Sequence, residues 1–162
     1  MADKVSPVPE GMHTLTPHIV VNDARKAIDF YQKAFGAVVC DVHPMPDGKI
    51  MHAAIKIGDS TVMLNDEFPE MGAPSPATTK TDTCVRLHLY VPDADKTFND
   101  AVGAGAKVIM PIADMFWGDR YGQVVDPFGH RWSIATRTKN MTEQEMKAAG
   151  EAAMAQMAHS AS

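Results

Sequence analysis

The chain is poor in cysteine and has no long apolar run. Its 162 residues include two cysteines, Cys40 and Cys84, without a CxxC spacing, so we expect both to be reduced, to lie in strands and to form no disulfide framework. No apolar stretch is long enough to span a bilayer, so no membrane partner is expected. Residues 1–11, MADKVSPVPEG, lack the apolar segment of a signal peptide, and we expect a cytoplasmic protein.

Several catalytic signatures and an excess of positive charge are missing as well. The sequence has no nucleophile elbow, no phosphate-binding glycine loop and no dinucleotide fingerprint, which argues against hydrolase, kinase and Rossmann-type functions. The formal net charge of -5 gives no indication of a nucleic-acid partner. With 45% hydrophobic and 22% charged residues, the composition is that of an ordinary globular domain with a core.

A short segment occurs twice, at an offset of 70 residues. Residues 16–26 read TPHIVVNDARK and residues 86–96 read RLHLYVPDADK. The residues that match at this offset include His18 and His88, Val21 and Val91, Asp23 and Asp93, and Lys26 and Lys96. Each copy combines an alternating strand with an Asp that can cap a following helix. A repeat at a fixed offset indicates an internally duplicated fold.

Both halves continue with the same order of elements, a helix followed by three strands. The sequence therefore predicts an α+β fold of two βαβββ modules, residues 14–66 and 83–137, joined by a linker at 67–82 and preceded by a flexible N-terminal arm at 1–13. The expected strands are 15–21, 38–42, 50–57 and 61–65 in the first half and 84–91, 108–112, 121–125 and 131–136 in the second.

Residues 138–162 lie outside both repeats and are expected to form a C-terminal helical tail. Thr142 and Glu145 fit a capping box, and residues 143–157 are rich in Ala, Met, Glu and Gln, which favours a helix. One interpretation is that this helix packs on its own sheet or on a dimer partner. The other is that its Met-rich face closes a pocket.

Four stretches carry a resemblance to a known family. Three of them are DFYQKAFGA at 29–37, MHAAIKIGDSTVMLND at 51–66 and FWGDRYGQVVDPFGHRW at 116–132. The fourth, DPFGHRW at 126–132, is the end of the third. With the duplicated βαβββ order, they resemble the vicinal oxygen chelate superfamily of glyoxalases, bleomycin-resistance proteins and extradiol dioxygenases, and within it the PhnB-like branch. The resemblance covers about residues 15–137. It implies a glyoxalase-like domain in which the modules form a curled mixed sheet around a cavity, with the helices outside, and usually a homodimer.

The resemblance also implies where metal ligands would lie. Metal-dependent members take four ligands from the cavity side of four strands, and the corresponding positions here are Thr16, Met63 (or Leu64, if the register shifts by one), Arg86 and Ser133. None is a histidine or a carboxylate, and a guanidinium repels a divalent cation. We therefore predict no metal ligand at these positions and no cofactor, and leave open a divalent metal at a relocated site.

Strand alternation predicts which side chains face the cavity. The inward set is Thr16, His18, Thr61, Met63, Asn65, Arg86, His88, Tyr90, Arg131 and Ser133, together with His52 of the third strand. Three interpretations of His18, His52 and His88 remain open: hydrogen-bonded structural residues, contacts of a pocket for a polar small molecule, or a relocated metal site. In the last two, a histidine can also act as a general base, so these three are the candidate catalytic residues.

The candidate ligand-binding residues are Arg86, Tyr90, Trp117, Arg120, Tyr121 and Ser133. Arg86 either pairs with a nearby acid or holds a carboxylate or phosphate of a ligand. The loop from Met115 to Tyr121 is either a plain hairpin connection or a flap whose Trp117 stacks on a ligand. Residues 126–129 are expected to form a turn and nothing more. His13, His43, His130 and His159 are expected to be solvated.

Two functions follow as hypotheses. The first is a metal-free protein that binds a small polar molecule in the sheet cavity, which the loss of the four ligand positions favours. The second is a metal-dependent lyase, isomerase or dioxygenase of the vicinal oxygen chelate type that uses relocated histidines. Metal content distinguishes the two hypotheses.

Overall fold

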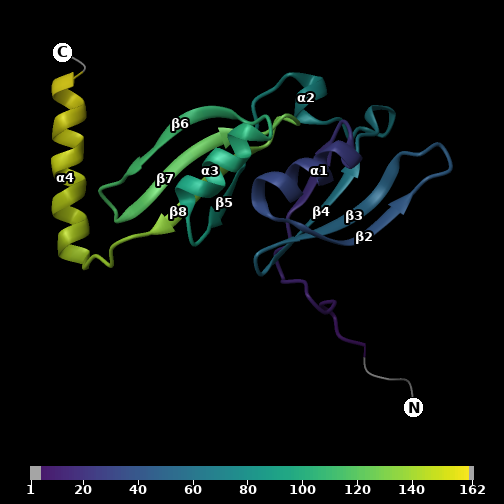
Figure 1. Ribbon diagram of the computed structural model, residues 1–162, viewed down its shortest axis with the longest axis horizontal. Helices are drawn as coiled ribbons and strands as arrows, with labels where there is room; N and C mark the ends of the chain where they lie inside the picture. Colours follow the sequence, from purple (N-terminus) through teal and green to yellow (C-terminus); the bar gives the residue numbers. More distant parts are fainter. Residues whose placement is uncertain (1–4, 161–162) are drawn as a thin grey trace.

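The computed structural model describes residues 5–160, and its element order is the predicted βαβββ taken twice (Figure 1). The first module contains β1 (His18–Val21), α1 (Ala24–Phe35), β2 (Val38–Pro44), β3 (Ile50–Ile57) and β4 (Ser60–Asp66). The second contains β5 (Arg86–Tyr90), α3 (Ala94–Gly103), β6 (Lys107–Asp114), β7 (Asp119–Val125) and β8 (Arg131–Arg137). The expected linker also carries two short helices, η1 (Pro69–Met71) and α2 (Pro76–Thr79), and the chain continues into α4 (Glu143–Ser160).

The strands form two separate four-stranded mixed sheets that stay open. Their orders are β1-β4-β3-β2 and β5-β8-β7-β6, with β1 parallel to β4 and β5 parallel to β8. The register repeats as well, because His18 lies opposite Met63 and His88 lies opposite Ser133. The fold class is thus confirmed, and the duplication extends to individual strand partners.

Equivalent hydrogen bonds hold the start of each helix to the last strand of its module. The backbone N–H of Ala24 donates to Asp66 at 2.7 Å, and that of Ala94 donates to Thr136 at 2.8 Å. The two bonds are related by the 70-residue offset, which takes Ala24 to Ala94 and Asp66 to Thr136. The predicted capping residues are also confirmed: Asp23 accepts from the N–H of Lys26, and Asp93 from that of Lys96. Satisfying the first N–H groups of a helix in this way fixes its start on the sheet.

One face of each sheet is covered by helices, and the other is open. α1 and α3 pack against each other as well as on the strands, so the two modules share one core (Figure 1). The buried strand residues include Val62, Leu64, Trp132 and Ile134, which the alternation had assigned to the helix side. The faces opposite the helices therefore carry most of the side chains predicted to be functional, with Arg120 as an exception.

The buried carboxylate of Asp126 joins the two modules. It is 4% exposed and accepts from the hydroxyl of Tyr31 on α1 at 2.7 Å and from the indole N–H of Trp132 at 2.8 Å. The backbone N–H groups of Phe128 and His130 donate to its other oxygen, each at 2.9 Å. The expectation of a turn and nothing more was wrong, because this turn directs a buried acceptor at the first module.

A second contact from the same turn crosses between the modules. The Nε2 atom of His130 lies 2.8 Å from the carbonyl oxygen of Val20 on β1, so His130 is not simply solvated as expected. Nearby, burial and the charge of Asp126 raise the pKa of the Tyr31 hydroxyl well above its ordinary value. Tyr31 therefore keeps its proton and donates to Asp126 over the whole physiological pH range.

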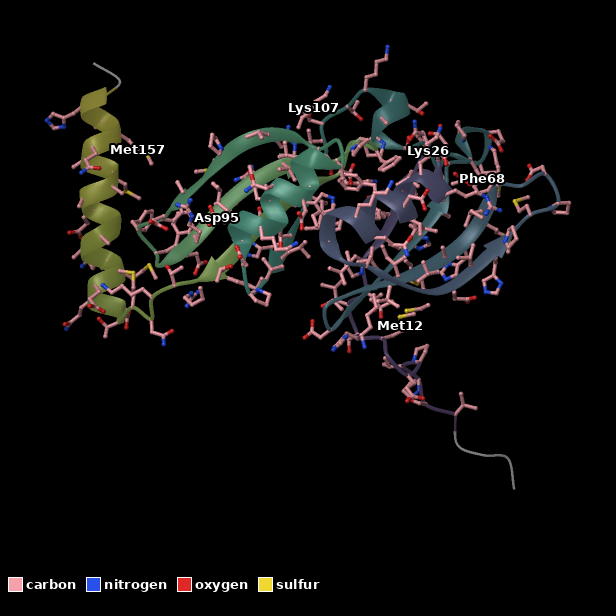
Figure 2. The ribbon with its side chains drawn as sticks, in the orientation of Figure 1. Met12, Lys26, Phe68, Asp95, Lys107 and Met157 are labelled. Atoms are coloured by element: carbon pink, nitrogen blue, oxygen red, sulfur yellow. The ribbon has the colours of Figure 1, made fainter. Side chains whose placement is uncertain are left out.

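Helix α4 stands apart from both sheets (Figures 1 and 2). Glu145 accepts from the backbone N–H of Thr142 at 2.8 Å, which confirms the predicted capping box. Met154 and Met157 are 72% and 68% exposed. The helix does not cover its own sheets, so packing against a partner remains a prediction. Within residues 5–160, no helix combines the length and apolarity required to cross a membrane.

We predict that Asp126→Ala lowers the free energy of unfolding by about 3 kcal/mol or more, because four donors at the module junction lose a buried charged acceptor. Denaturant unfolding monitored by circular dichroism measures the change. Asp59→Ala is the matched control: Asp59 lies in an exposed turn, and its removal should change stability by no more than about 0.5 kcal/mol. Equal effects of the two substitutions would contradict the role assigned to Asp126.

Candidate functional site

A buried carboxylate organises the open face of the second sheet. Asp119 on β7 is 1% exposed and accepts hydrogen bonds from the hydroxyl of Tyr90 and the indole N–H of Trp117, each at 3.1 Å. The guanidinium of Arg137 donates to its other oxygen and compensates the negative charge. Asp119 thereby fixes two aromatic side chains from different parts of the chain on one face of the sheet.

Four rings form what we call the aromatic wall: His88, Tyr90, Trp117 and Tyr121. The ring of His88 lies 4.5 Å from that of Tyr90 and 5.9 Å from that of Tyr121, and Trp117 lies 5.5 Å from Tyr121. The hydroxyl of Tyr121 lies 2.9 Å from that of Ser133, which holds the ring in place. The structure thus brings five of the predicted site residues together with these contacts.

His88 is the imidazole of the aromatic wall. Partial burial lowers the pKa of its imidazole from the ordinary value, and the negative charge of Asp119 opposes this only in part. A lowered pKa favours the neutral ring at physiological pH. Neutral imidazole can accept a hydrogen bond from a ligand, or a proton from a substrate.

Arg120 lies away from the other predicted ligand-binding residues. Its guanidinium makes a bidentate pair with Asp95 on α3, at 2.9 and 2.8 Å, and lies 3.5 Å from Asp114 (Asp95 is labelled in Figure 2). These contacts raise the pKa of Arg120, so it remains charged. Since Arg120 alternates with Asp119 and Tyr121 along β7, it points to the helix side and supports the packing of α3.

Two arginines lie side by side at one end of the same open face. Arg86 on β5 is opposite Arg131 on β8 in the strand register. Arg131 pairs with Asp82 at 2.9 Å. Among the described residues, none forms an ion pair or hydrogen bond with the Arg86 side chain. The structure therefore does not contain the acidic partner that was one of the two alternatives for Arg86.

The first strands of the two modules face each other across a gap that contains two cavities. One, of about 330 Å³, is lined in part by Thr16, Thr61, Arg86 and His88. The other, of about 270 Å³, is lined in part by His18, Leu87, His130 and Arg131. Strands β1 and β5 are each at the edge of their sheet, so residues at equivalent places in the two repeats meet in this gap.

Three histidines form a row on the open face of the first sheet. The ring of His52 lies 6.0 Å from that of His18 and 6.1 Å from that of His43. His18 donates to the amide oxygen of Asn65 at 2.7 Å, and His43 pairs with Asp41 at 2.6 Å. The structure therefore brings His18 and His52 together, adds His43 to them, and places His88 on the other sheet.

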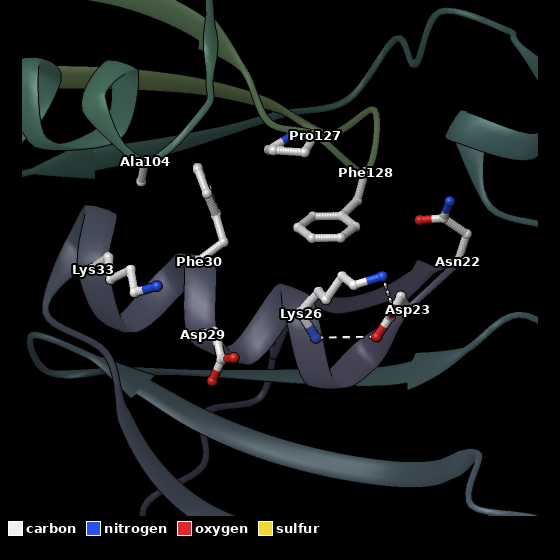
Figure 3. A pocket seen from close by; sticks show the side chains of 9 residues that line it. All are labelled: Asn22, Asp23, Lys26, Asp29, Phe30, Lys33, Ala104, Pro127 and Phe128. Atoms are coloured by element: carbon white, nitrogen blue, oxygen red, sulfur yellow. Dashed lines mark hydrogen bonds and ion pairs between the residues drawn. The ribbon is translucent and has the colours of Figure 1, made fainter.

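A further cavity, of about 450 Å³, lies on the helix side of the molecule (Figure 3). The rings of Phe30 and Phe128 form its apolar part, and charged side chains of α1 line its rim. One of these, Lys26, is already paired with Asp23 at 2.9 Å. This cavity contains none of the predicted site residues, and its aromatic residues belong to the core.

The residues at the four positions implied for metal ligands do not suit a divalent cation. Ser133 is 2% exposed and already bonded to Tyr121, Arg86 is cationic, and Met63 is a poor ligand for a hard cation. Within the described part of the chain, no group of three or more histidine, cysteine, aspartate or glutamate residues is placed to hold a metal ion.

Sequence reasoning missed Asp119, Arg137 and Gln123, which donates to the Tyr121 hydroxyl at 2.9 Å. A signal was present for two of them. Side chains two residues apart on a strand lie on the same face. Assigning Tyr121 to the open face therefore also assigns Asp119 and Gln123 to it. The role of Arg137 depends on its rotamer and had no comparable signal.

Comparisons with known proteins agree with this architecture. The uncharacterized protein Rv0887c of Mycobacterium tuberculosis is 49% identical over 137 residues, which cover 83% of this chain and 81% of that protein. The crystal structure of TioX from Micromonospora sp. ML1 is similar with a TM-score of 0.60 and 26% identity, covering 77% of this chain and 98% of that chain. The PhnB protein from Bacillus cereus shares the fold, with a TM-score of 0.56, 16% identity and coverage of 76% and 99%.

The sequence model of one family covers most of the chain. It matches residues 11–134, which include both βαβββ modules up to the last strand. The resemblance inferred from the sequence is therefore confirmed at the level of family and fold. The chain belongs to the Glyoxalase/Bleomycin resistance protein/Dioxygenase superfamily.

Proposed function

We propose that this chain binds a small polar molecule on the open face of its second sheet, without a metal at the four positions used by metal-dependent relatives. The observation that carries the proposal is the aromatic wall, whose Tyr90 and Trp117 are both held by the buried Asp119. Fixed aromatic surfaces beside a few polar groups are typical of small-molecule sites. Tyr90 remains 60% exposed, so its ring is available to a ligand.

The donor set supports binding without metal. Arg86 already supplies a positive charge at one end of the aromatic wall. Its guanidinium repels an approaching divalent ion. Polar contacts for a ligand come from the neutral His88 and from Gln123, which is half-buried beside Tyr121. These groups provide hydrogen-bond donors and acceptors beside the aromatic wall.

The second candidate function is an enzyme of the lyase, isomerase or dioxygenase type that uses a relocated histidine site. The row of His18, His43 and His52 favours it, because imidazole is a common metal ligand and a good general base. The hydrogen bonds of the row argue against a metal there, because His18 is bonded to Asn65 and His43 to Asp41. A histidine of the row acting as a base without metal is consistent with the same geometry.

The homodimer expected for the superfamily is part of the proposal. Both sheets leave one face uncovered, and α4 stands apart from both of them (Figure 1). A second copy offers matching surfaces, and a closed cavity around the aromatic wall requires a covering element from outside the chain. Sedimentation equilibrium distinguishes a dimer from a monomer directly, and a monomer at all concentrations would contradict this part of the proposal.

We predict that Tyr90→Leu weakens the binding of aromatic fragments at least about tenfold, because it removes an exposed ring from the wall. A screen of fluorinated fragments by ligand-observed NMR, followed by titration of the hits, measures the effect. Phe68→Leu is the control, since Phe68 lies in the linker and contacts Lys49 of the first module. Hits that bind equally well to both variants would place the site elsewhere.

We predict that protein purified without an affinity tag or chelator contains no stoichiometric divalent metal and takes up none when loaded with nickel, zinc, manganese or iron. Elemental analysis after desalting is the measurement. Stoichiometric metal that disappears in His18→Ala or His52→Ala would instead support the enzyme with a relocated site. Metal retained in both variants would point to ligands outside the histidine row.

The lowered pKa of His88 predicts a pH dependence of stability. Between the ordinary histidine value of about 6.5 and the lower folded value, the unfolded chain binds more protons than the folded one. The contribution of His88 is therefore complete above about pH 6.5 and is lost as the pH falls through the folded pKa. NMR titration of the ring signal that disappears in His88→Gln tests this. A midpoint at or above about 6.5 would refute it.

A further inference from the structure

The two arginines at the end of the aromatic wall suggest the chemical class of the ligand. We propose that the open face of the second sheet takes a planar aromatic molecule that carries an oxyanion, a carboxylate or phosphate, with the anion on Arg86 and the ring over Tyr90. This inference rests on the proposed function, because it concerns the same face. It adds the charge, shape and orientation of the ligand.

The positions of the side chains along β5 set the geometry. Arg86, His88 and Tyr90 alternate on one strand and so project from the same face. Successive residues on one face are about 6.6 Å apart, so the arginine and tyrosine positions differ by about 13 Å along the strand. The neutral ring of His88 lies between them, within 4.5 Å of the Tyr90 ring. A ligand that contacts both ends is elongated and has a polar group near its middle or anionic end.

The charge balance at this end favours an anion. Arg86 is exposed, and it lies beside a second cation, Arg131, at the same level of the sheet. Asp82 compensates Arg131 at 2.9 Å, whereas Asp59, which lines the cavity beside Arg86, forms no ion pair with it among the described contacts. Two adjacent guanidinium groups with one carboxylate leave one positive charge for a ligand, although the whole chain is acidic, at -5.

The opposite end favours an aromatic ring over an aliphatic group. Tyr90 is held at its hydroxyl by Asp119, so its ring cannot turn away without breaking that bond. Trp117 is held by the same carboxylate and stands edge-on to Tyr121, with 76° between the ring planes. Rings fixed in this manner present faces and edges on which a flat π-system stacks, with little loss of side-chain entropy on binding.

The experiment compares two probes of the same shape on three proteins. Biphenyl-4-carboxylate carries the anion, and biphenyl-4-carboxamide is its neutral isostere. Titration calorimetry is carried out with the wild type, Arg86→Gln and Arg25→Gln. Arg25 is the matched control, because it lies exposed on α1 on the helix side, and its removal changes the net charge equally.

We expect the wild type to bind the carboxylate about tenfold more tightly than the amide, since a charge-assisted bond to a guanidinium contributes about this factor. Arg86→Gln should abolish the difference by weakening only the carboxylate, and Arg25→Gln should preserve it. Inorganic phosphate, as a competitor, should reduce carboxylate binding to the wild type. Chemical-shift changes at Tyr90 and Trp117 should accompany binding of both probes.

The outcomes separate this inference from the proposed function. If both probes shift Tyr90 and Trp117 but Arg86→Gln leaves the preference unchanged, binding on this face stands and the anion site is overturned. If neither probe shifts the signals of Tyr90 and Trp117, the inference and the proposed function are both overturned for planar ligands. A greater affinity for cyclohexylacetate than for biphenyl-4-carboxylate, again dependent on Arg86, would retain the anion and overturn the requirement for a planar ring.

Discussion

The carboxylate of Asp126 is the constraint on which the arrangement of the modules depends. It is buried where α1 meets the second sheet, and it accepts from Tyr31 and Trp132 as well as from two backbone N–H groups of its own turn. A buried charge must be fully hydrogen-bonded, and its four donors come from both modules. Together with the contact between His130 and the carbonyl oxygen of Val20, this polar group fixes how the second sheet sits against the first module.

The duplicated architecture supports different chemistry on its two open faces. At equivalent places, His18 lies opposite Met63 and His88 lies opposite Ser133. The first face continues into a row of histidines, whereas the second continues into tyrosines and a tryptophan around a buried carboxylate. The open face of the first sheet thus carries a row of imidazoles, and that of the second carries an aromatic surface fixed by a carboxylate. Proteins that share a fold often differ in their sites. In this chain, the two modules share a fold and differ in the side chains on their open faces.

Much of the fold was predictable from the sequence, because it depends on local patterns. Alternation and the 70-residue offset predicted the order of helices and strands along the chain, the capping aspartates and the inward position of His88 and Tyr90. The missed features depend on contacts between distant residues: the bond from His130 to Val20 spans 110 positions, and nothing near His130 signals it. Asp119 was missed for another reason, since a buried carboxylate is predictable only when its donors, Tyr90, Trp117 and Arg137, are known to converge.

The loop that carries Trp117 is tied to the tail of the chain. The carbonyl oxygen of Gly118 accepts from the N–H groups of Thr138 and Lys139, and a Cβ atom at Gly118 would lie 2.6 Å from the carbonyl oxygen of Lys139. Opening the loop breaks these bonds, at a cost of about 1 kcal/mol for each. The aromatic wall is consequently held in one arrangement by contacts within the chain, and the segment that follows β8 takes part in holding it. For the binding proposed above, this would mean that no affinity is lost to the selection of a rare conformation.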